Sequence, residues 1–429
     1  MLPAQTTALV IGAGPTGVAA TISLLKAGCK DVVLVDASPA RSVFTSRAMA
    51  IHAATLEALE SIGCADQMAN RGIQSQGVTV CDRKSQLLTP GFTTLAPYTK
   101  YPYVLFLPQH ITEEILEQTL ENMGTKVIRS HKVVSLQDSG VEGVTSVHFE
   151  NGSVINARYI IGADGARSTV RQLSGINFTD PDGEASDTEN AAPQMVLADV
   201  VFNTTSPALP VDTAYSVMCS EGFILCFPLP KPLEGDETPY RIAFNLPLSQ
   251  ATPPSHPTTE LIQEYLNKRG PFGLSSDPSV NPSPIHITKT IWSTRFRTHS
   301  AVADTFTTIL KTESGKEGAH VFLVGDAAHV HSPAGGQGMN LGLRDAIGLS
   351  AVLTRHVEGD STALEEYAKE RHERALTTIR LTKRVMGIFT ALSTPGVFGG
   401  LQAAVVCFFG SLPFVKRMSA WQLSGLGNR

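Results

Sequence analysis

Residues 8–28 read ALVIGAGPTGVAATISLLKAG, and this stretch decides the fold class. Its first four residues form a continuous apolar run, which is typical of a strand buried on both faces of a sheet. From Val18 the pattern predicts a helix, and Gly28 is well placed to end it. Three glycines stand between strand and helix with the spacing G-x-G-x-x-G, namely Gly12, Gly14 and Gly17. The stretch therefore predicts a strand, a tight turn and a helix in immediate succession.

A second apolar run completes the unit. Residues 31–38, DVVLVDAS, predict another buried strand that ends in Asp36, and together the elements predict a dinucleotide-binding βαβ unit. Gly12 permits the tight turn, Gly14 lets the backbone approach a pyrophosphate, and Gly17 allows close packing of helix on strand. The Asp36 carboxylate can accept hydrogen bonds from both ribose hydroxyls but would repel a 2′-phosphate, so the unit suits FAD or NAD rather than NADP. The alternative is a glycine-rich turn of structural use only.

The composition is that of an ordinary globular chain. Its 429 residues leave room for about two or three domains, and 17% of them are charged while 42% are apolar. The net charge of −5 and the absence of a Lys/Arg run argue against a nucleic-acid partner. The six cysteines include no CxxC pair, so we expect no metal site and a reducing compartment. The first residues show no signal-peptide pattern, so we expect a cytoplasmic protein.

One apolar stretch lies near the C-terminus. Residues 397–415, VFGGLQAAVVCFFGSLPFV, are uncharged and approach the length that spans a membrane. Three glycines and Pro413 interrupt the run, and Lys416 and Arg417 follow it directly. We therefore expect a buried C-terminal helix pair and no transmembrane span, while a weak membrane association stays open.

The rest of the chain alternates between helical and strand patterns. Helices are predicted over Ala48–Gly63 and His110–Gly124, the second with Thr112 as its cap, and Asn151-Gly152 signals a hairpin. A β-rich block within a chain whose ends read as α/β predicts an α/β protein: a discontinuous Rossmann-like domain with an inserted, mostly antiparallel sheet domain. The predicted boundaries are 1–75, 100–178 and 288–375 for the nucleotide-binding domain, 76–99 and 179–287 for the inserted domain, and 376–429 for a C-terminal helical segment.

Two further motifs follow apolar strands. Residues 162–171 read GADGARSTVR and place Asp164 just after a strand, and residues 325–340 read GDAAHVHSPAGGQGMN and place Asp326 in the same way. Singly, each motif could be an ordinary turn at the end of a strand. Their order and spacing in one chain make coincidence a poor explanation.

With these three motifs the chain resembles the single-component FAD-dependent aromatic-ring hydroxylases and monooxygenases, a para-hydroxybenzoate hydroxylase-like family with many members in secondary metabolism. The resemblance covers nearly the whole chain and is weakest over residues 180–283. It implies FAD as the cofactor, with NADPH or NADH as a transient co-substrate. It further implies O2 and a small aromatic substrate, phenolic or indolic, as partners.

The resemblance also implies roles for single residues. In that family the aspartate at Asp326 bonds the ribityl chain of FAD, and the loop Pro333–Asn340 passes beneath the flavin ring. The residue at Gln109 lies beside the pyrophosphate, and the arginine at Arg47 lines the flavin, while a frequent second arginine is replaced here by Ala54. The fingerprint and the resemblance together predict these cofactor-binding residues: Gly12, Ala13, Gly14, Pro15, Thr16, Gly17, Asp36, Arg47, Gln109, Asp164, Gly325, Asp326, Gly338, Met339 and Asn340.

The implied reaction inserts one oxygen atom from O2 into an electron-rich organic substrate through a flavin C4a-hydroperoxide. Pro333 and Gly336 would belong to the catalytic loop beneath the ring, where glycine leaves room for a close approach of the backbone. Tyr215 and Arg241 are candidates for the substrate wall, although either could equally be an ordinary residue of a sheet surface.

Other activities remain open on the same motifs. An epoxidase, a Baeyer–Villiger enzyme, a halogenase or a reductase could use this fold, although halogenases of the related type carry WxWxIP and here Trp292 and Trp421 stand far apart. A non-catalytic prenyl-protein escort would not need the loop SPAGGQGMN. His52, His329 and His331 each invite an acid–base role, but a structural role is more usual for a single histidine.

Overall fold

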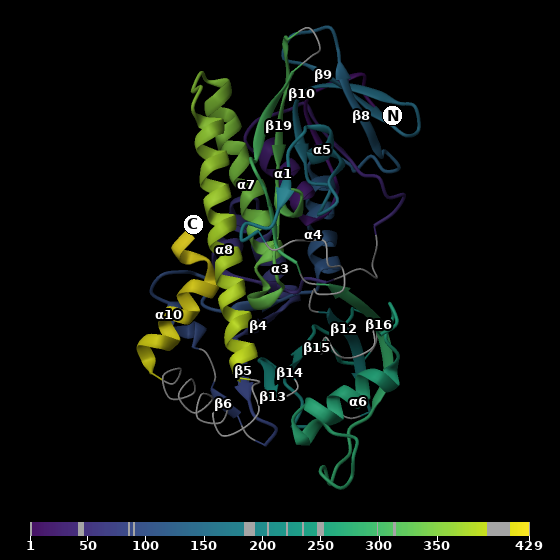
Figure 1. The fold of residues 1–429 in the computed structure, drawn as a ribbon, viewed down its shortest axis with the longest axis vertical. Coiled ribbons are helices and arrows are strands. Elements are labelled where there is room, and N and C mark those ends of the chain that lie inside the picture. The colour runs from purple at the N-terminus through teal and green to yellow at the C-terminus, as the bar shows by residue number, and fades with distance from the viewer. Residues whose placement is uncertain are drawn as a thin grey trace.

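The fold consists of two parts that lie one above the other in Figure 1, each built on its own large sheet. Long helices accompany the upper sheet, and one short helix covers the lower sheet. The structure is a computed structural model. It describes residues 2–41, 47–84, 86–88, 91–183, 194–203, 206–219, 222–233, 236–246, 253–297, 299–311, 315–392 and 412–428.

The first sheet has seven strands and a parallel centre. The order β18-β19-β10-β1-β2 forms its main path, and β9 and β8 extend it from β10. The strands β1, β2, β10 and β19 run parallel, and β18 is antiparallel to β19. The predicted hairpin is confirmed, because Gly152 has φ +82° between β9 and β10. The strands are β1 (Gln5–Ile11), β2 (Val32–Val35), β8 (Val133–Asp138), β9 (Thr145–Phe149), β10 (Val154–Gly162), β18 (Thr307–Lys311) and β19 (Glu317–Leu323).

The helix that follows the glycine turn is almost wholly buried. Val18, Ala19 and Ile22 are fully buried because this helix packs against two other helices, α7 and α4. The longest helix, α8, lies beside α7 along the upper part (Figure 1). The helices of this part are α1 (Pro15–Lys26), α4 (Gln109–Asn122), α5 (Thr169–Leu173), α7 (Gly338–Val357) and α8 (Ala363–Leu392).

Two predictions about helix starts were wrong. The helix expected from Ala48 begins only at Ala53, as α2 (Ala53–Ser61), because Ala50 and Ile51 form β3 and pair with β7 (Val104–Phe106). Tertiary pairing here overrides local helix propensity. Thr112 does not cap α4, since the helix begins at Gln109 with Pro108 as its N-cap, and Thr112 is buried inside the first turn.

The second sheet also has seven strands, in the order β16-β12-β15-β14-β13-β5-β6. All its pairs are antiparallel except β13 with β5, so the expectation of a mostly antiparallel sheet is confirmed. The helix α6 (Thr259–Arg269) covers one face. The strand β16 begins at residue 287, the last residue of the predicted inserted domain, and continues beyond it within the second sheet. The division into domains stays a prediction. The strands are β5 (Val78–Cys81), β6 (Gln86–Leu88), β12 (Gln194–Phe202), β13 (Ala214–Cys219), β14 (Gly222–Pro228), β15 (Pro239–Leu246) and β16 (Ile287–Arg297).

Smaller elements join the two parts and complete the chain. Two three-stranded sheets have the orders β3-β7-β4 and β11-β17-β20. The remaining elements are β3 (Ala50–Ile51), β4 (Ile73–Ser75), β11 (Phe178–Thr179), β17 (Ala301–Ala303), β20 (His329–Val330), α3 (Ala65–Arg71), α10 (Pro413–Ser424), and the short 3-10 helices η1 (Phe92–Leu95), η2 (Phe272–Leu274), η3 (Gly325–Ala327), η4 (Ala334–Gly336) and η5 (Leu426–Asn428).

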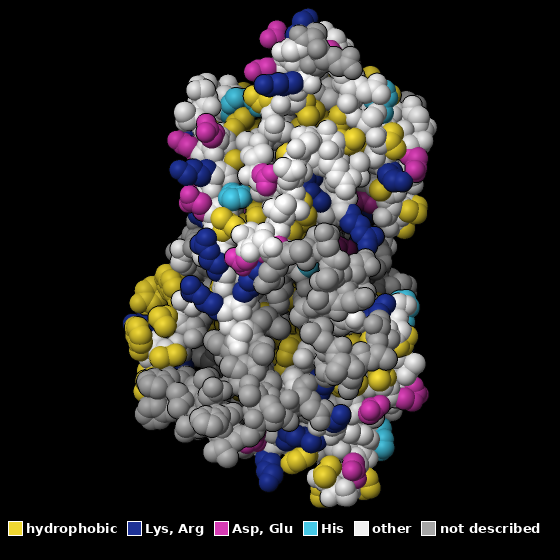
Figure 2. All heavy atoms as spheres, viewed as in Figure 1, with side chains coloured by type: hydrophobic (Ala, Val, Ile, Leu, Met, Phe, Trp, Pro, Cys, Tyr) yellow, Lys and Arg dark blue, Asp and Glu magenta, His cyan; other side chains and the backbone are white. Residues whose placement is uncertain are grey.

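The C-terminal helix α10 carries apolar side chains on its outside. Figure 2 shows them gathered over this helix, and Leu412, Phe414 and Met418 are 38%, 64% and 44% exposed. Most of the apolar stretch 397–415 lies outside the described residues, so the weak membrane association stays a prediction. Within the residues that the structure describes, we find no helix with the length and apolar character that a membrane crossing requires.

Candidate cofactor site and active site

All three sequence motifs meet at one edge of the first sheet. Ile11 lies in register with Val35 and Gly162, and Gly162 with Leu323, so four parallel strands end at the same level. Residues that follow these strands therefore emerge side by side. The carboxyl edge of a parallel sheet is where open α/β folds bind their ligands.

The glycine turn combines close packing with one open position. A Cβ on Gly12 would lie 2.3 Å from the carbonyl oxygen of Ala163, and a Cβ on Gly17 would lie 1.8 Å from the carbonyl oxygen of Gly12. A Cβ on Gly14 would meet nothing within 4 Å. Gly12 and Gly17 are therefore required by the protein itself, whereas Gly14 leaves space beside the turn that the protein does not fill.

The start of α1 faces this open space. Gly14 is its N-cap and supplies no side-chain hydrogen bond, and Pro15 occupies the first helical position. The free N–H groups and the positive end of the helix dipole favour a negatively charged group here. An open cradle at an uncapped helix N-terminus fits the pyrophosphate of FAD.

Asp36 ties the second strand to the glycine turn. One carboxylate oxygen accepts a hydrogen bond from Ala13 N at 2.7 Å, and the other accepts one from Ser38 N at 2.7 Å. A carboxylate has about four acceptor positions, so each oxygen keeps capacity for one more donor. This arrangement fits a ribose diol.

Asp164 is directed into its own motif. Its carboxylate accepts hydrogen bonds from the Ser168 hydroxyl and from Thr169 N at 2.7 Å, at the start of α5. Arg171 donates to the carbonyl oxygen of Ala327 at 2.8 Å and so joins the second motif to the third. In this structure Asp164 therefore shapes the turn that borders the cleft.

Asp326 and the nearby Arg47 face the region that is called the cofactor cleft below. The side chain of Asp326 is exposed to solvent, yet protein surrounds it closely, and this desolvation raises the pKa of the carboxyl group. His329, Arg47 and His299 act in the opposite direction, which places the exposed Arg47 within electrostatic reach of Asp326. A carboxyl group that is both exposed and crowded lines a cleft rather than an open surface.

Gln109 lies next to the segment that carries Arg47. Its backbone N–H donates to the carbonyl oxygen of Ala48 at 3.0 Å, and its side-chain oxygen accepts from Ala48 N at 3.3 Å. Its side-chain amide also donates to Glu113 at 2.8 Å. The structure thus joins Gln109 to the segment that carries Arg47, and Arg47 in turn acts electrostatically on Asp326.

The glycine loop of the third motif is held by the segment around His52. Gly335 and Gly336 have φ +75° and +63°, and a Cβ on Gly336 would lie 3.0 Å from the Cβ of Ala50. His52 donates from Nε2 to the carbonyl oxygen of Gly335 at 2.7 Å. Burial lowers the pKa of His52 to about 4, so the neutral ring makes this hydrogen bond near neutral pH. Residues Pro333–Asn340 are called the ring loop below.

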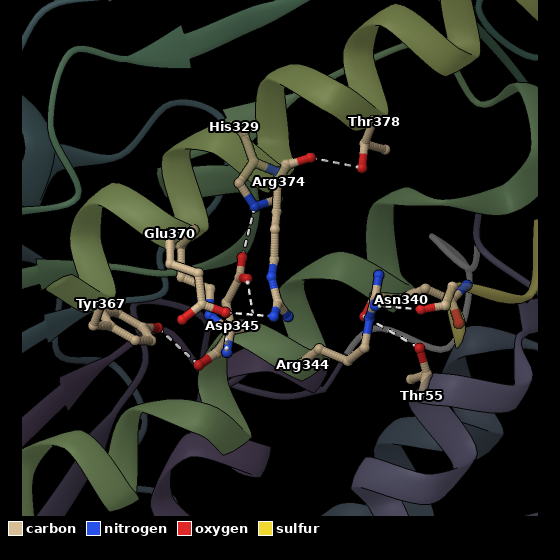
Figure 3. A network of polar contacts seen from close by, with 11 residues as sticks. Thr55, His329, Asn340, Arg344, Asp345, Tyr367, Glu370, Arg374 and Thr378 are labelled. Atoms are coloured by element: carbon tan, nitrogen blue, oxygen red, sulfur yellow. Dashed lines mark hydrogen bonds and ion pairs between the residues drawn. The ribbon is translucent and has the colours of Figure 1, made fainter. Parts of the chain in front are cut away.

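Asn340 closes the ring loop. Its side-chain amide donates to the carbonyl oxygens of Ala50 and Gly336 at 2.7 and 2.6 Å, and its oxygen accepts from His52 N at 2.8 Å. The backbone carbonyl of Asn340 accepts from Thr55 at 3.3 Å (Figure 3). Four hydrogen bonds thus fix the point where the loop enters α7.

A buried hydrogen bond between two side chains anchors the other side of the loop. His329 donates from Nε2 to Asp345 on α7 at 2.7 Å, and both side chains are at most 1% exposed. Figure 3 shows Tyr367 of α8 beside them, where its hydroxyl donates to the backbone carbonyl of Asp345 at 2.8 Å. His329 therefore has a structural partner. Asp345 was missed in the sequence, because only the helical phase of α7 turns it toward His329.

The two candidates for the substrate wall lie on opposite faces of the second sheet. Tyr215 pairs with Cys226, which pairs with Ile242, and these residues belong to the apolar cluster beneath α6. Arg241 lies on the face toward the first part and donates to the backbone carbonyl of Arg47 at 2.8 Å. The structure therefore brings Arg241, and not Tyr215, to the cofactor cleft.

Comparison with known proteins agrees with this geometry. The family described as FAD binding domain matches residues 5–231 and 282–382. The "Uncharacterized aromatic compound monooxygenase YhjG" of Bacillus subtilis (strain 168) is 30% identical over 429 residues, which cover 98% of this chain and 76% of that protein. FAD is thus the cofactor that the site is built to hold.

Solved structures show the same fold. The p-nitrophenol 4-monooxygenase PnpA from Pseudomonas putida DLL-E4 matches with a TM-score of 0.79 over 100% of both chains, at 22% identity. The anhydrotetracycline hydroxylase OxyS from Streptomyces rimosus matches with a TM-score of 0.70 at 26% identity, over 98% of this chain and 76% of that one. The chain belongs to the para-hydroxybenzoate hydroxylase-like family of FAD-dependent aromatic hydroxylases and monooxygenases, and it is an oxidoreductase.

Proposed function

We propose that the protein uses NADPH or NADH and O2 to insert one oxygen atom into a small, electron-rich aromatic substrate, phenolic or indolic. The observation that carries this proposal is the ring loop, which meets the cleft of Arg47 and Asp326 and is fixed on both sides by buried hydrogen bonds. The names of the relatives, an aromatic compound monooxygenase and an anhydrotetracycline hydroxylase, support an aromatic substrate. FAD, when bound and reduced, supplies an activated form of oxygen at its ring.

Three groups of residues would hold the cofactor. Gly14 and the start of α1 would receive the pyrophosphate, Asp36 the ribose, and Asp326 the ribityl chain. Gln109 and Arg47 border the same cleft. The remaining predicted cofactor residues lie in the glycine turn and the start of α1, at the start of η3 and at the start of α7: Gly12, Ala13, Pro15, Thr16, Gly17, Gly325, Gly338, Met339 and Asn340, with Asp164 at the same edge of the sheet.

The ring loop would hold the reacting end. The last three residues of the ring loop, Gly338–Asn340, form the start of the 20-residue helix α7, and no side chain caps this helix. Its positive end would stabilise negative charge on a reduced cofactor nearby. Pro333 and Gly336 shape the loop, because the backbone N–H of Gly336 donates to the carbonyl oxygen of Pro333 at 3.0 Å.

We place the substrate wall on the face of the second sheet that points away from α6. One row across this face comprises Ser216, Leu225, Ala243 and Leu197, which lie directly opposite one another on successive strands. The Ser216 hydroxyl is buried and has no hydrogen-bond partner within the described part of the chain. One polar group in an apolar row is the usual make-up of a small-molecule site. An apolar wall would also exclude water from the reaction.

The test is a measurement of product with labelled oxygen. Purified protein with NADPH or NADH and 18O2 is incubated with a panel of phenolic polyketides and indoles, and the products are analysed by mass spectrometry. We expect one 18O atom per product molecule. Halide-dependent products would favour a halogenase, and reduced products without label would favour a reductase. Label at a ring carbon, at a double bond or beside a carbonyl separates hydroxylation from epoxidation and Baeyer–Villiger insertion.

A further inference from the structure

A buried ion pair crosses the second sheet close to the cofactor cleft. Arg241 on β15 and Asp199 on β12 lie directly opposite each other in register. Arg241 donates from Nε to one oxygen of Asp199 at 2.7 Å and from Nη2 to the other at 2.8 Å. Arg241 is 1% exposed and Asp199 is 8% exposed. This paired geometry fixes the plane of the guanidinium group.

The third guanidinium nitrogen reaches out of the sheet. Nη1 of Arg241 donates to the carbonyl oxygen of Arg47 at 2.8 Å and approaches that of Ala48 at 3.5 Å. The same short segment is held from the other side by the first part of the molecule, where Leu107 N donates to the carbonyl oxygen of Met49 at 2.7 Å. Residues Arg47–Met49 are thus clamped between the substrate-side sheet and the cofactor domain.

The surroundings of the ion pair are aromatic and apolar. The guanidinium carbon of Arg241 lies 5.5 Å from the centre of the Trp292 ring. Phe227, opposite Arg241 on β14, packs edge-on against Phe106 of β7 at 5.5 Å. A buried ion pair adds little stability compared with apolar residues of the same size. Its value here lies in the direction of the third donor, which an apolar residue could not supply.

We propose that Arg241 and Asp199 form a latch through which the substrate-side sheet sets the position of Arg47 in the cofactor cleft. Arg47 acts electrostatically on Asp326, so a shift of its backbone would change the charge that faces the cofactor. Arg241 is then a positioning residue and not part of the substrate wall. The link to oxygen transfer rests on the proposed function, but the link between the sheet and Arg47 does not.

The experiment replaces both charges together. The double variant Arg241→Met with Asp199→Leu removes the pair without leaving a buried unpaired charge, so the sheet should stay folded. Amide hydrogen exchange over residues 47–51 is measured in the FAD-free protein and should become about ten- to hundredfold faster, the factor expected for one lost hydrogen bond to a charged group. The affinity for FAD, measured by flavin fluorescence, should fall by about the same factor or less.

A matched control uses another ion pair. Glu117 on α4 and Arg129, which follows this helix in the chain, pair at 2.6 Å and are about one-fifth exposed. The double variant Arg129→Met with Glu117→Leu should leave exchange over residues 47–51 and FAD affinity unchanged. If amide exchange over residues 47–51 changes by the same factor in both double variants, the latch does not exist.

A second variant covers the case in which the double variant fails to fold. Arg241→Lys keeps a positive charge beside Asp199 but has no planar fork that could serve Asp199 and Arg47 at once. Exchange should become faster over residues 47–51 while that of β12 and β15 stays as in the wild type. Wild-type exchange over residues 47–51 in this variant would overturn the proposal. Because exchange is measured without substrate or turnover, the result is independent of whether the protein oxygenates an aromatic compound.

Discussion

The two large sheets carry their polar groups in different places. In the first sheet the parallel strands β1 and β10 are apolar near their carboxyl ends, with Leu9, Val10, Ile160 and Ile161 fully buried, and the polar groups of the site follow the strands in turns. In the second sheet the polar groups Arg241, Asp199 and Ser216 stand within strands and are buried there. A site at strand ends depends on local turn chemistry, whereas a site on a sheet face depends on which residues the register brings together.

The largest expected effect comes from the packed part of the glycine turn. In Gly17→Ala the new Cβ would lie 1.8 Å from the carbonyl oxygen of Gly12, and only backbone movement can relieve this overlap. We expect a loss of about 3 kcal/mol or more in the free energy of unfolding, measured by urea denaturation of the FAD-free protein. Gly387→Ala within α8, where a Cβ would meet nothing within 4 Å, serves as the control for substitution of a helical glycine as such. Wild-type stability in Gly17→Ala would contradict the geometry of the turn.

This turn is also where the sequence was most informative. The spacing of Gly12, Gly14 and Gly17 and the position of Asp36 are local features, so the βαβ unit followed from the pattern alone. The pairing of Arg241 with Asp199 could not be predicted, because it depends on the register of strands 42 residues apart. The face of the second sheet on which Tyr215 lies depends on the same register. The start of α2 was misplaced because Ala50 and Ile51 pair with Phe106 and Leu105, which lie outside any local window.

The next effect separates Gly14 from Gly17. Gly14→Val places its side chain in open space, so we expect a folded protein with stability within about 1 kcal/mol of the wild type, the usual range for a helix N-cap change. The same side chain would occupy the space of the pyrophosphate, so the variant should purify without FAD. Bound flavin per chain is read from the absorption spectrum. Full flavin content in this variant would mean that the open space beside Gly14 serves another purpose.

A smaller effect is expected at the ribityl position. Asp326→Ala removes a charged hydrogen-bond acceptor from the cleft, worth roughly 1.5–3 kcal/mol, or about a ten- to hundredfold loss of FAD affinity. Asp326→Asn keeps an acceptor oxygen, so its affinity for FAD should lie between that of the wild type and that of Asp326→Ala. The dissociation constant of FAD is measured by fluorescence titration for all three proteins. Equal constants would show that Asp326 does not contact the cofactor.

A substitution in the ring loop should change the oxygenation reaction more than the affinity for FAD. Gly336 has φ +63°, and in Gly336→Val a branched side chain must adopt a left-handed conformation that costs roughly 1–2 kcal/mol, beside Ala50. We expect the variant to keep most of its FAD, because the other end of the cofactor is held in the glycine turn. A displaced loop would admit water, so NAD(P)H oxidation should yield hydrogen peroxide instead of oxygenated product. The measured quantities are product per NAD(P)H consumed and flavin per chain. Complete flavin loss, or wild-type coupling, would assign the loop another role.

The smallest expected effect is a pH dependence confined to the ring loop. Burial lowers the pKa of His52 to about 4, below the value of about 6.5 for an exposed histidine. Between these two values the unfolded chain binds a proton at His52 that the folded chain does not, so stability falls as the pH is lowered. This residue should contribute a slope of about 1.4 kcal/mol per pH unit in that range. His52→Gln retains an N–H donor for Gly335 and has no proton to gain, so its free energy of unfolding should vary less steeply with pH by about that amount. His331, whose pKa burial also lowers to about 4, remains in the variant and keeps part of the slope. An unchanged slope in His52→Gln would mean that the His52 ring is not the buried neutral donor that holds the loop.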